Sequence, residues 1–222
     1  MKQAFFITGT DTGAGKTLIA SALVYHYARQ GFNSLGMKPV AAGCELKNGR
    51  LMSEDASQLI AASNVDAEVD LINPYAFSAA IAPHIAAAAD GMAIELPVIL
   101  QAYAQLASQA DVVIVEGVGG FCVPLGDAFD TADLAQQLGL PVILVVGIRL
   151  GCLNHALLTV EAIERRGLKL AGWVANQPEP QMAAPAENLQ ALKQRIAAPC
   201  IAVVPLLEQP DFKLAARYIQ LD

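Results

Sequence analysis

Hydrophobic residues along the chain alternate between short apolar runs and longer segments with apolar positions at helical spacing. The runs at 112–116 and 142–147 are almost continuously apolar, which is typical of strands covered on both faces of a sheet. This alternation predicts an α/β fold, a mainly parallel sheet with helices on both faces and right-handed crossovers. The expected strands are Ala4–Thr8, Ser34–Lys38, Val112–Glu116, Val142–Gly147, Ala171–Asn176 and Cys200–Val204, and the expected helices lie near residues 17–30, 54–63, 95–110, 131–138, 154–166 and 186–197.

The chain shows no point at which it would divide into domains. Its 222 residues contain no internal repeat and no low-complexity linker. The segment Asn176–Pro185 carries three prolines and is expected to form an exposed loop, but an apolar strand pattern follows it. We therefore expect a single domain spanning residues 1–222.

Charge and hydropathy exclude several classes of partner. The net charge is −7 and no block of Lys or Arg forms a stripe, which argues against nucleic acid binding. The long apolar region Ala76–Ala89 contains Pro83 and is too short to span a bilayer, and the tail after residue 211 offers no membrane anchor. Strand-like residues begin at once, without a signal-peptide pattern. We expect a cytoplasmic protein with neither nucleic acid nor membrane as partner.

The cysteines are far apart and do not have the spacing of a metal site. Free thiols in a reducing compartment are the expected state. The residues are Cys44, Cys122, Cys152 and Cys200.

A glycine-rich loop follows the first apolar run and precedes a helical pattern. Its sequence is Gly-Thr-Asp-Thr-Gly-Ala-Gly-Lys-Thr at residues 9–17. Glycines let backbone N–H groups converge on a polyphosphate, Lys16 would reach the terminal phosphates, and the Thr17 hydroxyl would ligate Mg²⁺. The following helix would add its positive dipole end beneath the anion. The segment therefore predicts a nucleotide site.

This loop departs from the usual P-loop pattern by one residue. With Gly15 as the second glycine, the pattern places its first glycine at position 10, which is Thr10, whereas Gly9 stands one residue earlier. A plain strand-to-helix turn with a solvated Lys16 is the alternative interpretation. The order of strand, loop, Gly-Lys-Thr and helix favours nucleotide binding.

Other strands would deliver further groups to the same edge, because ligands of such sheets lie at the carboxyl ends of the strands. The second strand ends at Lys38, and the third ends in Glu116 before Gly117, the layout of a Walker-B-type metal ligand with Glu in place of the commoner Asp. Asp55 could supply another Mg²⁺ oxygen. Taken alone, Asp55 is explained more simply as a helix-capping acid, and Lys38 as a solvated lysine.

Taken together, these motifs make the chain resemble the dethiobiotin synthetases over essentially its whole length. The one-residue-longer glycine loop is the form of that family. The matching segments are Gly-Thr-Asp-Thr-x-x-Gly-Lys-Thr at 9–17, Lys38-Pro39-Val40-Ala41, Ser53 to Ala56 loosely, Asn73-Pro74-Tyr75, Pro83-His84-Ile85, Val115 to Gly120, Val145-Val146-Gly147, Leu150 to Ala156 and Ala171 to Asn176.

The resemblance implies a P-loop NTPase-like fold and an ATP- and Mg²⁺-dependent ligase. Its substrates would be 7,8-diaminononanoate, carbon dioxide and ATP as co-substrate. A carbamate would form on one amine, react with the γ-phosphate to give a carbamic–phosphoric anhydride, and close to dethiobiotin in biotin biosynthesis. The resemblance also implies a homodimer.

It further implies roles for individual residues. Lys16 and Lys38 would flank the transferred phosphoryl group as the catalytic lysines, and Thr17, Asp55 and Glu116 would hold Mg²⁺. The nucleotide would also contact Gly13, Ala14, Gly15, Leu18, Gly117, Val118, Gly119, Asn176, Gln177, Pro205, Leu206 and Leu207, with Asn176 reading the adenine and Pro205–Leu207 lining its pocket. The second substrate would contact Thr12, Lys38 and Ala42, and its carboxylate would meet Gly151, Cys152, Leu153 and Asn154 across the dimer interface.

Two positions depart from the family pattern. Relatives usually carry Glu where this chain has Gly13, and a hydroxyl residue where it has Ala42. Both departures concern substrate affinity rather than phosphate or metal chemistry. His26, His84 and His155 are too scattered for a metal site. His26 is expected on the surface of a helix, and His84 and His155, which lie in matching segments, receive no role beyond packing or framing of the site.

Two alternatives share this kind of nucleotide fold. A cobyrinate-type amide-forming synthetase would need a glutaminase domain, for which 222 residues leave no room. A partitioning or Min-type ATPase switch would carry an extra lysine four residues before the second glycine, where this chain has Asp11.

Overall fold

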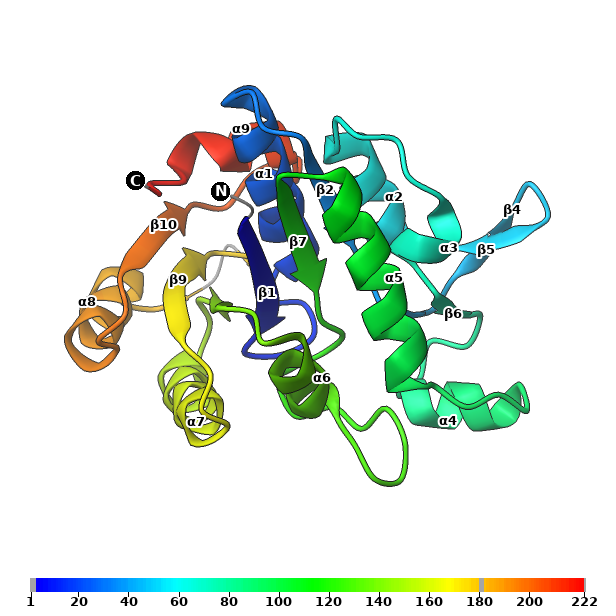
Figure 1. The fold of residues 1–222 in the computed structure, drawn as a ribbon. Helices are drawn as coiled ribbons and strands as arrows, with labels where there is room; N and C mark the ends of the chain where they lie inside the picture. The colour runs from blue at the N-terminus through cyan, green and yellow to red at the C-terminus, as the bar shows by residue number, and fades with distance from the viewer. Residues whose placement is uncertain (1–2, 180–181, 222) are drawn as a thin grey trace.

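The computed structural model describes residues 3–179 and 182–221 and is built around a six-stranded sheet in the order β10-β9-β8-β1-β7-β2 (Figure 1). Every pair of neighbouring strands in this sheet is parallel. All carboxyl ends therefore meet at one edge, with β1 between β8 and β7. The strands are β1 (Gln3–Gly9), β2 (Ser34–Met37), β7 (Val112–Glu116), β8 (Val142–Gly147), β9 (Leu170–Asn176) and β10 (Cys200–Val204).

Helices cover both faces of the sheet, as the sequence predicts. Successive residues of a strand point to opposite faces. Accordingly, Phe6 packs in the core layer beneath α5 and α6, whereas Ile7 packs in the layer beneath α1. A third buried cluster, on the same face of the sheet as Phe6, packs Trp173 against α7 and α8. These helices are α1 (Lys16–Arg29), α2 (Glu54–Ala62), α5 (Leu96–Gln109), α6 (Thr131–Leu138), α7 (Cys152–Arg165) and α8 (Pro185–Arg195).

The expected strands and helices are all present, but one strand ends earlier than predicted. The second strand ends at Met37 rather than Lys38, because the Lys38 N–H donates to Ile72 O at 2.8 Å instead of joining the sheet ladder. Pro39, which has no N–H, follows directly. The chain leaves the main sheet at this point.

The region after β2 contains elements that the pattern did not predict. A small parallel sheet pairs β3 (Val40–Ala42) with β6 (Tyr75–Phe77). Three-residue strands are too short to show a period-2 pattern, so tertiary packing decides them. The other unpredicted elements are the hairpin β4 (Glu45–Lys47) and β5 (Arg50–Met52), the short helices α3 (Val69–Ile72), α4 (Pro83–Ala89) and α9 (Phe212–Ala215), and the 3₁₀ turn η1 (Ala216–Tyr218).

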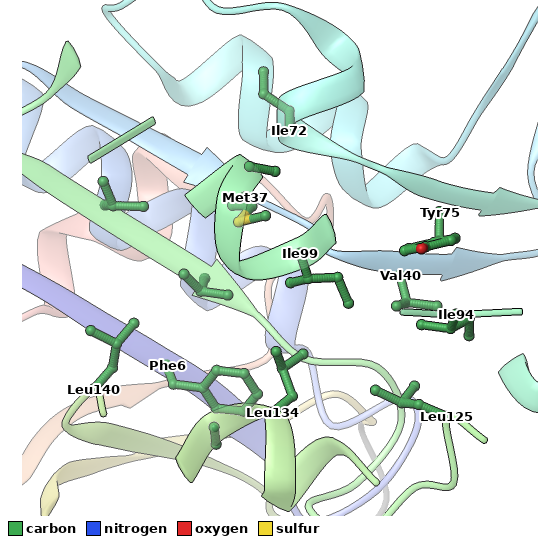
Figure 2. Packing of buried hydrophobic residues seen from close by; sticks show 14 of the residues in the cluster. Phe6, Met37, Val40, Ile72, Tyr75, Ile94, Ile99, Leu125, Leu134 and Leu140 are labelled. Atoms are coloured by element: carbon green, nitrogen blue, oxygen red, sulfur yellow. The ribbon is translucent and has the colours of Figure 1, made fainter. Parts of the chain in front are cut away.

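The small sheet is joined to the main one by a continuous apolar core. Met37 at the end of β2, Val40 on β3, and Ile72 and Tyr75 before and on β6 all belong to the same buried cluster (Figure 2). Ile99 of α5 packs into it as well. This core fixes the turn that contains Lys38.

Other expectations concern loops, thiols and membranes. The expected loop Asn176–Pro185 is shorter than predicted, because Asn176 is buried at the end of β9 and Pro185 begins α8. The described residues between them hold no helix or strand, and Pro180 and Gln181 lie outside the described residues. The four cysteines are free thiols. Across residues 3–179 and 182–221, no helix combines the length and apolarity needed to cross a bilayer.

Candidate active site

The glycine loop connects β1 to α1 at the carboxyl edge of the sheet. Gly13 and Gly15 have φ angles of 75° and 91°, values that favour glycine. At Gly15 a Cβ atom would also lie 2.1 Å from Asn176 Nδ2. Both its backbone conformation and its surroundings therefore require glycine here.

Asn176, at the end of β9, is buried and contacts the backbone of the glycine loop. Its Nδ2 donates to the carbonyl of Ala14 at 2.9 Å. Ala14 is itself buried, so its own side chain faces the core rather than the cleft. In this structure Asn176 therefore positions the loop.

Lys16 begins α1 with only 7% of its surface exposed. Its Nζ donates to the carbonyl of Asp11 at 3.1 Å. Burial, followed by repulsion from Lys38, lowers the pKa of Lys16 to about 8. An anion close to Nζ would restore the usual preference for the charged form.

Four side chains meet beside Lys16 in a cluster of charged and hydroxyl groups. Thr17 Oγ1 lies 2.7 Å from Asp55 Oδ1 and 2.8 Å from Glu116 Oε1. Lys38 Nζ lies 2.7 Å from Glu116 Oε1 and 2.7 Å from Asp55 Oδ2, and donates to the Gly117 carbonyl at 3.0 Å. Because β7 lies between β1 and β2, Glu116 stands between the glycine loop and Lys38.

The charges of this cluster are matched to one another. Burial by itself would lower the pKa of Lys38, but Glu116 and Asp55 outweigh it and raise that pKa. Burial would likewise raise the pKa of Asp55, yet Lys38 and Thr17 lower it overall. Burial raises the pKa of Glu116 despite Lys38. Lys38 is thus held protonated between two carboxyl groups.

The same cluster fits a magnesium ion. Glu116 Oε2 is buried and has no hydrogen-bond partner among the described residues. The available donors are carboxylate and hydroxyl oxygens, the ligand type of hard cations. No group of three or more His, Cys, Asp or Glu side chains forms a metal cage within the described chain. Magnesium bound to phosphates typically uses only one or two carboxylates, so Thr17, Asp55 and Glu116 suffice.

A cleft of about 710 Å³ opens over these groups. Most of the residues proposed for the phosphates, the metal and the amines line it. They are Thr12, Gly13, Gly15, Lys16, Thr17, Lys38, Ala42, Asp55, Glu116, Val118 and Gly119.

One wall of the cleft was not anticipated. It consists of Ala80, Ile81, Ala82 and Pro83, with Val123 contributing from the loop after β7. The segment Pro83-His84-Ile85 was singled out in the sequence, but without a position for it. The loop before α4 has no periodic pattern, so only its packing reveals this apolar wall.

Several proposed residues lie elsewhere. Gln177 and Pro205 line a separate, mainly apolar pocket of about 310 Å³ beside β10. Leu206 is partly exposed, and Leu18 and Leu207 pack against the core on the α1 face. Gly117 meets the cluster through its carbonyl.

The residues 151–154 begin α7 and are absent from the described lining of the cleft. Gly151 has a φ angle of 93°, which favours glycine, and Cys152 is buried. Leu150, just before them, is 96% exposed. Within one protomer this turn therefore does not meet the cleft.

Arg149 contacts the glycine loop, which the sequence did not predict. Its Nη2 lies 3.1 Å from Asp11 Oδ2 and 3.5 Å from the carbonyl of Thr12. It therefore links the glycine loop to the segment that starts α7. No local motif signals this pair, because the two residues are 138 positions apart.

Comparisons with known proteins place the chain in a family. A protein-family model described as an AAA domain matches residues 3–212. The chain is 56% identical over 219 residues to the ATP-dependent dethiobiotin synthetase BioD of Aromatoleum aromaticum, covering 99% of this chain and 97% of that protein. It is 52% identical to the protein of the same name from Nitrosospira multiformis, covering 95% of this chain and 92% of that protein.

Solved structures of more distantly similar proteins share the P-loop NTPase-like fold of this chain. A ParA family ATPase from Chlorobium tepidum superposes with a TM-score of 0.59 at 15% identity, covering 94% of this chain and 86% of that one. The septum site-determining protein MinD of Pyrococcus horikoshii gives 0.55 at 16% identity, covering 99% and 87%. At such identities the likeness concerns the fold alone, so it does not favour the switch alternative. On the strength of its near full-length identity to these synthetases, the chain belongs to the dethiobiotin synthetase family.

Proposed function

We propose that the chain converts 7,8-diaminononanoate, carbon dioxide and ATP into dethiobiotin, ADP and phosphate, as a step of biotin biosynthesis in the cytoplasm. Members of this family are ATP-dependent ligases that form a carbon–nitrogen bond. The observation that carries the proposal is that Lys16, Thr17, Lys38, Asp55 and Glu116 line one cleft.

The reaction would proceed in three balanced steps. One amine attacks carbon dioxide and loses a proton, which gives a carbamate. A carbamate oxygen then attacks the γ-phosphorus of ATP, and ADP leaves. The second amine attacks the carbonyl carbon of this anhydride, phosphate leaves, a proton is lost, and the cyclic urea is closed.

The residues supply what the phosphoryl transfer requires. It brings an anionic oxygen towards anionic phosphate, so fixed cations must neutralise the charge. Lys16 and Lys38, which stand on opposite sides of Glu116, would both contact the transferred phosphoryl group. Thr17, Asp55 and Glu116 would hold Mg²⁺, which when bound neutralises phosphate charge.

The nucleotide would extend from the cleft along the loop. The backbone amides of Gly13–Leu18 would bind the phosphates, and Gly117–Gly119 would border them. Asn176 and Gln177 would contact the base, with Pro205–Leu207 beside it. The location of Gln177 and Pro205 in an apolar pocket supports this assignment.

The diamine would lie beside the phosphates in the same cleft. Thr12 and Ala42, which line it, would border the amines. Ala42 has no hydroxyl group to donate, and Gly13 has no side chain, so this end presents fewer polar contacts than the family pattern. The apolar wall at residues 80–83 suits the methylene chain.

We further propose a symmetric homodimer in which Gly151–Asn154 of one protomer binds the carboxylate of the substrate in the cleft of its partner. The amides at the start of α7 suit a carboxylate. The exposure of Leu150 supports an interface at this turn.

Product analysis tests the reaction. Purified protein is incubated with 7,8-diaminononanoate, bicarbonate, ATP and Mg²⁺, each omitted in turn, and dethiobiotin and ADP are quantified. Equal amounts of both, formed only in the complete mixture, are expected. ADP formation that does not depend on the diamine would contradict the proposal.

Subunit complementation tests the shared site. Lys16→Ala and Asn154→Asp are each expected to be inactive, the second because its carboxylate opposes that of the substrate. After demonstrated subunit exchange, each heterodimer keeps one intact site, so activity should return. Heterodimers without recovered activity would contradict a site shared between subunits.

A further inference from the structure

Asn73, in the segment just before β6, has no role in the reaction proposed above. Only 5% of its surface is exposed. Its Nδ2 donates to the carbonyl of Lys38 at 2.8 Å and to the carbonyl of Tyr75 at 3.0 Å. Both protons of the amide are therefore used on backbone groups.

These contacts hold Lys38 on the short segment that connects the main sheet to the small sheet. The main sheet ends at Met37, and β3 of the small sheet begins at Val40. The Lys38 N–H donates to Ile72 O at 2.8 Å, and its carbonyl accepts from Asn73. Lys38 thus has no strand neighbour, and the segment 72–73 provides both of its backbone hydrogen bonds.

The surroundings allow only one orientation of the Asn73 amide. Met37, Val40, Ile72 and Tyr75 form a common buried cluster around this turn (Figure 2). With the amide reversed, its oxygen would face two carbonyl oxygens. Asn73 Oδ1 has no partner among the described residues, so the two donated bonds are what the side chain contributes.

The side chain of Lys38 depends on this anchoring. Its ammonium contacts Glu116, Asp55 and the Gly117 carbonyl at 2.7–3.0 Å. A small shift of the Lys38 backbone would lengthen these three contacts beyond hydrogen-bond distance. Misplacement of a reacting group by about 1 Å typically costs about 100-fold in rate.

We propose that Asn73 is a positioning residue that fixes the backbone of Lys38 and so aims its ammonium at the transferred phosphoryl group. The catalytic part of this inference rests on the proposed function. The anchoring part rests on the contacts alone, and a separate measurement tests it.

Asn64, which is exposed, offers a control at the opposite end of β2. Its Oδ1 accepts from the Ser34 N–H at 2.8 Å, and its Nδ2 donates to the carbonyl of Phe32 at 2.9 Å. Asn64→Ala also removes two side-chain hydrogen bonds to the backbone next to β2, but it does so away from the cleft. Asn73→Ala removes the side-chain amide that donates to the Lys38 carbonyl. Asn73→Asp keeps the size of the side chain but replaces the amide NH₂ donor with a carboxylate oxygen.

Kinetics and amine labelling are measured on folded full-length protein. Both Asn73 variants should lower kcat by about 10- to 100-fold, while KM for ATP changes by less than about threefold. An amine-acylating reagent followed by mass spectrometry should label Lys38 several-fold faster in these variants, with exposed Lys169 as internal standard. Asn64→Ala should change neither quantity.

An unchanged kcat in both Asn73 variants would overturn the proposal. Equal changes in Asn64→Ala would also overturn it, since the effect would then belong to β2 as a whole. Failure of both Asn73 variants to fold would assign the residue to stability and overturn it too. If the wild type makes no dethiobiotin, the proposed function fails, whereas the labelling of Lys38 still decides the anchoring.

Discussion

Two buried lysines stand on either side of Glu116, and their environments differ. Lys16, on the glycine loop, bonds to a backbone carbonyl and has its pKa lowered to about 8 by burial and by Lys38. Lys38, at the end of β2, is buried as well, but Glu116 and Asp55 raise its pKa. Among the described residues Lys16 has no carboxylate within ion-pair distance, whereas Lys38 has two.

This difference indicates that the charge of Lys16 serves to bind a ligand, whereas the charge of Lys38 is paired within the protein. The charge of Lys16 is paired only when an anion arrives, so its protonation and its ligand are coupled. The charge of Lys38 is already neutralised within the protein. We therefore expect changes at Lys16 to affect nucleotide binding as well as turnover, and changes around Lys38 to affect stability and metal binding as well as turnover.

The largest expected effect follows from Lys16→Ala. Removing a group that stabilises transition-state charge typically costs about 100- to 1,000-fold in rate. Turnover of dethiobiotin should fall by this amount, with the fold intact by circular dichroism. Lys47→Ala, on the exposed β4–β5 hairpin, is the control and should keep full activity. Activity of Lys16→Ala within about threefold of wild type would refute the assigned role.

Glu116→Gln should shift the magnesium dependence by about tenfold or more. The amide preserves the shape but removes the charge that a hard cation requires. A magnesium titration of activity measures the midpoint, and Glu54→Gln, on the exposed face of the helix that carries Asp55, is the matched control. An unchanged midpoint would remove Glu116 from the metal site. Lys38 would also keep only Asp55 as a carboxylate partner, so the melting temperature should fall.

The affinity for ATP should depend on pH through Lys16. Its pKa of about 8 lies below the usual 10.5, so it loses its charge as pH rises through 8. Because ATP binds the charged form better, its dissociation constant should rise about tenfold from pH 7 to pH 9. Calorimetric titration measures it. Lys16→Arg stays charged over this range and should show a flatter profile, whereas a flat wild-type profile would contradict the comparison.

The smallest effect is expected from the exposed ion pair of the glycine loop. Arg149 and Asp11 are partly exposed, and such pairs contribute at most about 1 kcal/mol. Arg149→Ala should therefore weaken ATP binding by no more than about fivefold, and less so in high salt. A loss as large as that of Lys16→Ala would place Arg149 among the phosphate-binding groups instead.

The sequence predicted the main sheet, its covering helices and the glycine loop. Long apolar runs and amphipathic segments report burial through neighbours along the chain, which is why β7 and β8 were identified with their bounds. The strands β3 and β6 are too short for such a pattern. The segments that contain Asn73 and Pro83 match the family pattern, but no local signal placed Asn73 beside Lys38 or residues 80–83 on the wall of the cleft.

By itself, the sequence determined the order of the elements and the residue types available at the end of each strand. Only the tertiary structure decided which of these residues meet. Lys38 and Glu116 are 78 positions apart, and Thr17 and Glu116 are 99 apart. They come together because β7 lies between β1 and β2 in a parallel sheet, a neighbour relation that arises from packing and not from local periodicity.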